Sequence, residues 1–254
     1  MNKEKLWKAW LHEEEIAHIH GWDFSHIRGK YQEGNDLPWD YKEIIQKYLT
    51  PDMKLLDIDT GGGEFLLSLK HPYNNLAATE SYPPNVELCK ETLLPLGIDF
   101  KEADGCDDRL PFEDQTFDMV INRHGEFNAK EIRRILKPGG LFITQQVGAE
   151  NDRELVQLLL NDVPPLPFPM QYLQIIQKSF EEVGFTTLEA DEVYRPIRFW
   201  DVGALVWFAR IIEWEFPGFN VRDCLDNLYQ AQRILEQNGV IEGRSHRFLL
   251  VVRK

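Results

Sequence analysis

Cysteine is scarce in this sequence, and long apolar runs are absent from it. Its three cysteines, Cys89, Cys106 and Cys224, lie far apart. Their number and spacing exclude a disulfide framework and the usual zinc-ligand patterns. The opening residues, MNKEKLWKAWLHEEE, lack the apolar segment of a signal peptide, and no stretch of about 18 apolar residues occurs. We therefore expect a cytoplasmic protein without a membrane segment.

Basic residues are also in short supply. Lys and Arg total 28 against 42 Asp and Glu, which gives a formal net charge of −14. Such a surface repels phosphate backbones on average, so we do not expect nucleic acid as a partner. The chain has 254 residues, of which 43% are hydrophobic, and it can bury a sizeable core. We expect a single domain over residues 1–254 that forms a monomer or a homodimer.

Short apolar runs alternate with helical patterns in the middle of the chain. Asn128 can cap one of these helices, and Glu131 follows three residues later, as in a capping box. The sequence Lys137-Pro138-Gly139-Gly140 ends that helix. The alternation predicts an α/β fold with a doubly wound, mostly parallel sheet. The predicted strands are residues 54–58, 76–79, 98–102, 117–121 and 141–147, with helices from 64, over 86–94 and after 128.

The pattern changes after residue 150. Helices predominate, and we expect a helical insertion at about 199–238, just before the last strand. The predicted helices cover residues 152–160, 171–183, 201–215 and 221–237, and the predicted strands cover 185–193 and 247–252.

Glycines and acidic residues follow three successive predicted strands. The first strand runs into Asp57-Ile58-Asp59-Thr60-Gly61-Gly62-Gly63, Glu80 closes the second, and Asp104 follows the third. Glycines permit a sharp turn and close approach of a ligand, and open α/β sheets bind ligands at these strand ends. One carboxylate can accept both ribose hydroxyls, and another can reach an adenine edge. A dinucleotide fingerprint would need a third glycine where Leu66 stands. The ordered set therefore predicts a site for a nucleoside-shaped ligand.

Several phrases together resemble class I S-adenosylmethionine-dependent methyltransferases. They are LLDIDTGGGEF, the acidic Glu80, ADGCDDRLPFEDQTFDMVINRH and RILKPGGLFITQQV. The resemblance is strongest to small bacterial methyltransferase-domain proteins with a GTGGGEF-like first motif, and it covers roughly residues 50–150. It implies a Rossmann-like, seven-stranded sheet whose last strand is antiparallel, and it implies S-adenosyl-L-methionine as cofactor. On this interpretation residues 1–45 form an N-terminal helical cap, 46–150 the cofactor-binding core and 151–254 the C-terminal half.

The resemblance also implies roles for individual residues. The first-motif loop would surround the methionine part of the cofactor, Glu80 would bind ribose, and Asp104 with Gly105 would face adenine. Asn122 and Arg123 would lie near the methionine moiety, with His124 beside the transferable methyl group. The full cofactor-binding set is Asp57, Asp59, Thr60, Gly61, Gly63, Glu80, Ser81, Asp104, Gly105, Asn122 and Arg123.

Asp59 departs from the family pattern, which usually has glycine there. Its side chain could crowd the cofactor, or its charge could attract the positive sulfonium. The family's reaction is an in-line displacement at the methyl carbon, and a general base is needed only if the acceptor must lose a proton. His124 and Glu126 are the candidate catalytic residues. A plain loop histidine, and a charge that favours the next helix N-terminus, remain open as their alternative roles.

Aromatic and histidine residues gather outside this core. His12, His18, His20 and His26 match no standard zinc spacing, so we expect no metal. An aromatic lid over the cofactor cleft is expected from Trp22, Phe24, His26, Trp39 and Tyr41, with packing on the sheet edge as the alternative. The insertion carries aromatic residues that we assign mainly to core packing, some of them also lining an acceptor pocket. They are Phe199, Trp200, Trp207, Phe208, Trp214 and Phe216.

The sequence thus predicts a methyltransferase that uses S-adenosylmethionine to methylate an acceptor, which we expect to be a small molecule. Two alternatives remain: a non-catalytic module that binds S-adenosylmethionine, in which Asp59 has ended turnover, and an RNA or protein methyltransferase.

Overall fold

The chain folds into two compact units in the computed structural model, which describes residues 2–18, 23–34 and 36–254. The first, here the helical unit, contains the described residues up to 37 together with 148–169 and 193–246. The second, the sheet unit, contains 38–147, 170–192 and 247–254. Strands β7 (Thr186–Phe199) and β8 (Ile241–Arg253) contribute residues to both units. The single domain stays a prediction.

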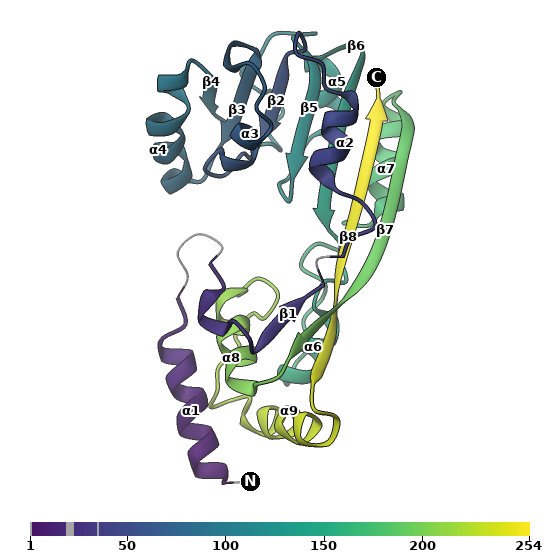
Figure 1. Ribbon diagram of the computed structural model, residues 1–254. Helices are drawn as coiled ribbons and strands as arrows, with labels where there is room; N and C mark the ends of the chain where they lie inside the picture. The colour runs from purple at the N-terminus through teal and green to yellow at the C-terminus, as the bar shows by residue number, and fades with distance from the viewer. Residues whose placement is uncertain (1, 19–22, 35) are drawn as a thin grey trace. The chain divides into compact units, whose positions relative to one another are not determined.

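The described residues form one eight-stranded sheet with the order β1-β7-β8-β6-β5-β2-β3-β4. Strands β2 to β6 are parallel to one another, and β8 runs antiparallel to β6. The mostly parallel, doubly wound fold and the antiparallel last strand are confirmed (Figure 1). The remaining strands are β1 (Tyr31–Glu33), β2 (Leu55–Ile58), β3 (Leu76–Glu80), β4 (Asp99–Glu102), β5 (Phe117–Arg123) and β6 (Leu136–Val147).

The predicted strand count of seven was wrong by one. The additional strand is β1, which pairs antiparallel with the end of β7, Tyr31 opposite Phe199. A three-residue strand is too short to show an alternating pattern. The same pairing explains why β7 continues to Phe199, whereas the prediction ended it at Val193.

Helices cover both faces of the sheet within the sheet unit (Figure 1). Neighbouring residues of a strand point to opposite faces of the sheet, as the pleat requires. On β5, Ile121 belongs to a first cluster of buried apolar side chains and Val120 belongs to a second one. The first cluster includes side chains of α2 (Tyr41–Tyr48), α3 (Glu64–Ser68) and α4 (Pro83–Thr92), and the second includes those of α5 (Ala129–Ile135) and α7 (Leu173–Glu182).

Two helices begin where local chemistry satisfies their first N–H groups. Helix α4 starts at Pro83, three residues earlier than predicted, because a proline has no N–H to leave unpaired in the first turn. Helix α8 (Val202–Ile211) begins after Asp201, whose Oδ1 accepts a hydrogen bond of 2.8 Å from the Ala204 N–H. It ends at Ile211, short of the predicted residue 215.

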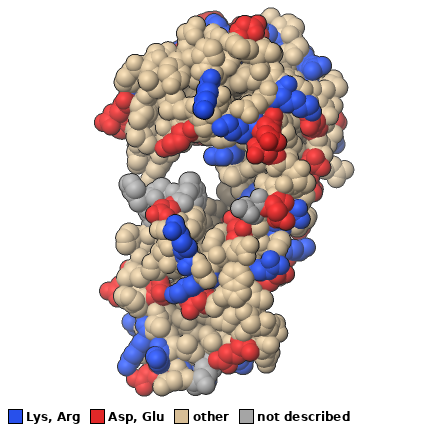
Figure 2. All heavy atoms as spheres, in the orientation of Figure 1, with Lys and Arg blue, Asp and Glu red and all other residues tan. Residues whose placement is uncertain are grey.

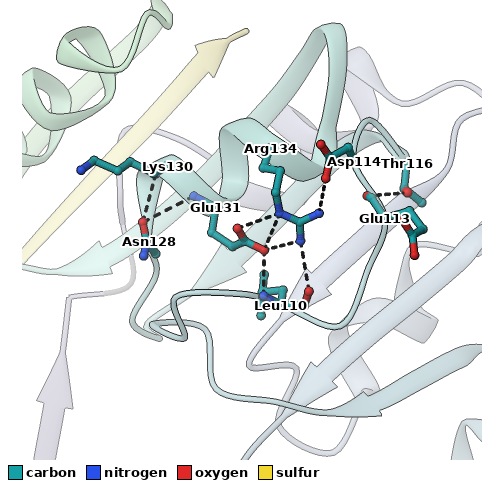
Figure 3. A network of polar contacts seen from close by, with 8 residues as sticks. All are labelled: Leu110, Glu113, Asp114, Thr116, Asn128, Lys130, Glu131 and Arg134. Carbon is teal, nitrogen blue, oxygen red and sulfur yellow. Dashed lines mark hydrogen bonds and ion pairs between the residues drawn. The ribbon is translucent and has the colours of Figure 1, made fainter.

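The predicted capping box before α5 was half right (Figure 3). Asn128 Oδ1 accepts from the backbone N–H groups of Lys130 and Glu131, at 3.1 and 3.4 Å, so Asn128 is the cap. The buried Glu131 carboxylate instead accepts from Leu110 N–H at 2.7 Å and pairs with Arg134. Arg134 also binds Asp114 at 2.7 Å. This network fixes the loop between β4 and β5 onto α5.

The helical unit has its own apolar core. Trp10 packs there with Phe199, Trp207, Phe208 and Phe216, all almost fully buried. Core packing is therefore confirmed for four of the six insertion aromatics. Trp200 and Trp214 are 42% and 47% exposed. The other helices of the helical unit are α1 (Lys3–Glu15), α6 (Arg153–Leu159) and α9 (Leu225–Asn238). Short 3-10 turns lie in both units, at Ser25–Ile27, Tyr73–Asn75 and Leu94–Leu96.

Two further features are the length and hydropathy of the helices and the distribution of charge on the surface. No helix among the residues that the structure describes is both long and apolar enough to cross a membrane. On the face drawn in Figure 2, basic and acidic side chains are interspersed.

Candidate functional site

Glu80 ties together the loops that follow two neighbouring strands. The residue lies at the end of β3 and is 6% exposed. Oε2 accepts a 2.7 Å hydrogen bond from Gly61 N–H, and Oε1 accepts from the N–H groups of Ser81 and Tyr82 at 3.0 and 2.9 Å. The Asn85 side-chain amide is a fourth donor, 3.5 Å from Oε2, so a ligand hydroxyl would share or replace one of these donors at the four or so lone-pair positions of the carboxylate. The structure thus brings Glu80 against the glycine turn, as the ordered motif suggested.

Asp57 lies buried at the end of β2. Its Oδ2 accepts a 2.7 Å hydrogen bond from the Thr60 hydroxyl. Burial raises the pKa of Asp57 to about 7, and the charge of Glu80 adds to the rise, while Thr60 and Arg123 oppose it. This carboxyl group therefore changes charge near neutral pH.

Asp59 adopts a left-handed backbone conformation, with φ of 55°. Its Oδ1 accepts a hydrogen bond from Gly105 N–H at 3.3 Å. Glycines make room for the carboxylate: a Cβ at Gly125 would lie 2.4 Å from Oδ2, and one at Gly105 would lie 2.9 Å from it. Burial, followed by the charges of Glu80 and Asp104, raises the pKa of Asp59 to about 7.

Asp104 is held in a local turn of the loop after β4. Its Oδ1 accepts from Cys106 N–H at 3.0 Å. Hydrogen bonding with the Cys106 side chain, and then with this N–H, lowers the pKa of Asp104. Gly105 next to it sits under Glu126, because a Cβ there would meet the Glu126 carbonyl oxygen at 2.2 Å. The charges of Glu80, Asp104 and Asp57 all act on Asp59 and raise its pKa, and the charge of Glu80 also acts on Asp57.

Asn122 joins three strands at the end of β5. Its side chain donates to Ile58 O at 3.1 Å and accepts from Gln146 at 2.6 Å. The Asn122 carbonyl oxygen accepts from the Tyr41 hydroxyl at 2.9 Å, and that hydroxyl also lies 3.1 Å from Ile143 O. These bonds give Asn122 a structural role at the strand ends. This role does not depend on any contact between its backbone and a ligand.

Arg123 and His124 follow on the same strand end. The Arg123 guanidinium lies 4.6 Å from the centre of the Phe65 ring, which stacks on Tyr41. His124 has φ of 66°, and its Nε2 lies 3.3 Å from Gln145 Nε2. Although the His124 side chain is open to solvent, surrounding protein atoms desolvate it, and with the charges of Arg247 and Arg123 this lowers its pKa to about 3.

Glu126, the second predicted catalytic residue, is exposed beside Cys106. The carboxylates of Asp104 and Glu126 raise the pKa of the Cys106 thiol to about 11, with desolvation contributing. The roles of His124 and Glu126 in catalysis stay predictions.

The residues proposed for an aromatic lid fall into both units. Trp22 lies outside the described residues. Phe24 packs on Trp207, and His26 binds Glu13 at 2.7 Å, within the helical unit. Trp39 and Tyr41 instead reach the ends of β5 and β6, where Trp39 donates to Gln145 at 2.8 Å. The lid itself stays a prediction.

Three residues near these strand ends escaped the sequence reasoning: Phe65, Gln145 and Gln146. Phe65 has no polar signal, and it was hidden in the apolar pattern of α3. The glutamine pair did carry a signal, because two adjacent amides interrupt the apolar run LFITQQV where that strand ends.

A family model and several known proteins are similar to parts of this chain. A family model described as a methyltransferase domain matches residues 56–144. Phthiotriol/phenolphthiotriol dimycocerosates methyltransferase of Mycobacterium tuberculosis is 33% identical over 91 residues, covering 32% of each chain. Demethylmenaquinone methyltransferase of Deinococcus radiodurans is 28% identical over 121 residues, covering 43% of this chain and 49% of the relative. The chain thus spans from a third to half of these curated relatives.

Solved structures match over a larger share of the chain. A Bacillus halodurans C-125 protein with a provisional methyltransferase assignment has a TM-score of 0.55 at 18% identity, and the match covers 85% of this chain and 98% of that one. At this identity the likeness concerns the fold alone. Residues 56–144 match the family model of a methyltransferase domain, and the chain shares its fold with the Bacillus halodurans protein.

Proposed function

We propose that this chain is an S-adenosylmethionine-dependent methyltransferase that transfers a methyl group to a small molecule by in-line displacement. The observation that carries the proposal is the hydrogen bond between Glu80 and Gly61, with Asp57 and Asp59 close by. This bond places a carboxylate that can accept hydrogen bonds from ribose hydroxyls against a glycine turn, at the carboxyl ends of parallel strands.

The charges at these strand ends fit a cationic ligand. Asp57 and Asp59 both have a pKa raised to about 7, because they are buried and lie near other carboxylates. A ligand that brings positive charge would favour their ionised forms. S-adenosylmethionine carries a sulfonium and an ammonium group, so the residues present suit it.

When bound, the cofactor supplies a methyl group on an excellent leaving group. The chain's own residues then mainly bind and orient. Glu80 would accept from ribose hydroxyls in place of a present donor such as Asn85, which lies 3.5 Å away, and Gly61 lies beside it in the turn after β2. Asn122, held by Ile58 and Gln146, fixes the strand end that leads to Arg123 and His124.

A small-molecule acceptor is supported by two observations. The curated relatives named above act, by their names, on a mycobacterial lipid and on a quinone. The formal net charge of −14 disfavours a polyanionic acceptor such as RNA.

Binding calorimetry with S-adenosylmethionine and S-adenosylhomocysteine tests the proposal. We expect both ligands to bind. Glu80→Ala should weaken the binding of S-adenosylmethionine by about tenfold or more, because the ribose hydroxyls lose the carboxylate that accepts from them and the Gly61 N–H loses its acceptor. Glu91→Ala is the matched control, since it removes the same charge from an exposed position on α4. Absence of binding to the unmodified protein, or equal affinities for the two variants, would refute the cofactor site.

A further inference from the structure

A chain of hydrogen bonds fixes the amide orientation of Gln145. The Trp39 indole nitrogen lies 2.8 Å from Gln145 Oε1. An indole N–H can only donate, so the atom that faces Trp39 must be the amide oxygen. The Gln145 NH2 group is therefore turned the other way.

That orientation in turn fixes the tautomer of His124. Gln145 Nε2 lies 3.3 Å from His124 Nε2. An amide nitrogen has no lone pair to offer, so it must be the donor and His124 Nε2 the acceptor. The imidazole proton is then on Nδ1. The main chains of the two residues are joined as well, since His124 N–H donates to Gln145 O at 3.0 Å.

Desolvation by the surrounding protein atoms is the main reason why the pKa of His124 is lowered to about 3, and nearby charges add to it. The charged groups that act on it are Arg247 on β8 and Arg123 on β5, and both disfavour an imidazolium. Among the described residues, no hydrogen-bond partner of Nδ1 is found, and the side chain is exposed. An N–H donor is thus left open beside two guanidinium groups.

We propose that His124 is a hydrogen-bond donor, which offers Nδ1–H to an anionic oxygen of a ligand, and not the general base of the reaction. Trp39 and Gln145 are positioning residues that set its tautomer. The ligand oxygen belongs either to the cofactor's methionyl carboxylate or to an acidic acceptor such as an enolate, phenolate or carboxylate. The role in methyl transfer rests on the proposed function, whereas the tautomer does not.

Nitrogen-15 NMR of the histidine side chains in the ligand-free protein tests the tautomer directly. We expect His124 to be in the Nδ1–H form and to stay neutral from about pH 8 to about pH 5, where an ordinary histidine becomes charged. His71, whose Nε2 lies 2.7 Å from Met53 O, must donate there and provides an Nε2–H reference in the same spectrum. An Nε2–H His124, or one that titrates near pH 6.5, would overturn the proposal.

Two variants show whether Gln145 sets the tautomer. In Gln145→Glu, the second carboxylate oxygen can only accept, so we expect His124 to switch to Nε2–H and to titrate above about pH 6. Gln174→Glu adds the same charge on the exposed side of α7 and should leave His124 unchanged. In Trp39→Phe, the Gln145 amide loses the donor that fixes its orientation and can flip, so we expect a mixture of His124 tautomers. A Gln145→Glu protein that keeps the Nδ1–H form would contradict the positioning role.

Two ligands then distinguish the sources of the oxygen. S-adenosylhomocysteine carries the amino-acid carboxylate, and 5′-methylthioadenosine lacks it. A change of the His124 Nδ1–H signal with the first ligand alone assigns the donor to the cofactor, and no change with either assigns it to the acceptor. A change of equal size with both would overturn an anionic partner. Calorimetry of the same samples reports the cofactor site separately, so the two proposals can fail independently.

Discussion

Asp59 occupies a backbone position where the related motif has glycine. With φ of 55°, it uses the left-handed region that Asp tolerates better than most residues. The space for its carboxylate comes from Gly105 and Gly125, whose missing Cβ atoms would otherwise collide with it. The departure from the motif is therefore accommodated locally, and its main consequence is an additional negative charge.

That charge predicts a pH-dependent preference for the sulfonium. Asp57 and Asp59 are mostly protonated below their raised pKa of about 7 and ionised above it. We expect the affinity for S-adenosylmethionine, relative to the uncharged thioether S-adenosylhomocysteine, to rise by several-fold between about pH 6 and about pH 8. Calorimetry at the two pH values should show a smaller rise in Asp59→Asn. A ratio independent of pH would contradict this electrostatic role.

The same two groups predict the pH dependence of stability in the ligand-free protein. Their pKa is higher in the folded state than in the unfolded chain, where it is near 3.8. The folded state therefore holds protons that the unfolded state has released, and this contribution is lost as pH rises through about 7. Thermal unfolding should show that Asp59→Asn loses less stability than the unmodified protein between about pH 6 and about pH 8. Parallel profiles for the two proteins would argue against the shifted pKa.

At the scale of elements, the Glu131 network decides how the loop after β4 meets α5 (Figure 3). The Glu131 side chain is 5% exposed and that of Arg134 16%, while that of Asp114 is 65% exposed. Removing one partner of a buried pair leaves the other charge uncompensated. An exposed partner contributes little, because water screens it.

We therefore expect Glu131→Gln to lower the free energy of unfolding by about 3 kcal/mol. Asp114→Asn, the control on the same arginine, should change it by less than about 1 kcal/mol. Urea denaturation followed by circular dichroism would measure both. Similar losses for the two variants would show that Glu131 does not anchor the loop.

Helix α2 is fixed to the strand ends through one hydroxyl group. Tyr41 is 5% exposed, and its hydroxyl bonds to the carbonyl oxygens of Asn122 and Ile143. Tyr41→Phe should cost about 1–3 kcal/mol of stability, because these buried carbonyls lose a donor. Tyr73→Phe, at a position that is 43% exposed, is the control for urea denaturation. A Tyr41→Phe protein as stable as the control variant would exclude this anchoring role.

At the scale of the whole molecule, the proposed cofactor residues all belong to the sheet unit. The sequence-derived ligand loops follow β2 to β5, and the positioning residues Trp39 and Gln145 belong to the same unit. Strands β7 and β8 are shared by both units, so the insertion between them is linked to the sheet at both of its ends.

A ligand that binds the folded chain and not the unfolded chain raises the free energy of unfolding by mass action. At a free S-adenosylmethionine concentration of about 100 times the dissociation constant, we expect a gain of about 2.7 kcal/mol. Thermal unfolding with and without ligand would measure it, and at the same concentration Glu80→Ala should show a much smaller gain. Equal ligand-induced shifts in both proteins would indicate binding elsewhere.

Local pattern determined much of this protein. The alternation of apolar runs and helices predicted the parallel strands β2 to β6, because burial on two sheet faces imposes those periods on the sequence. The antiparallel direction of β8 was implied by the family resemblance. The positions of Asp57, Glu80 and Asp104 at successive strand ends followed from that alternation alone. Asn128 was recognisable as a cap because capping acts within one turn of helix.

Tertiary structure decided what depends on residues far apart in the chain. Glu131 bonds to Leu110 and not back to its own cap, and Tyr41 finds Asn122 across more than half of the sheet unit's sequence. The tautomer of His124 follows from Trp39 through Gln145, and the pKa of Asp59 follows from Glu80 and Asp104. Hydrogen-bond direction and desolvation depend on which groups meet in space, so no sequence period encodes them.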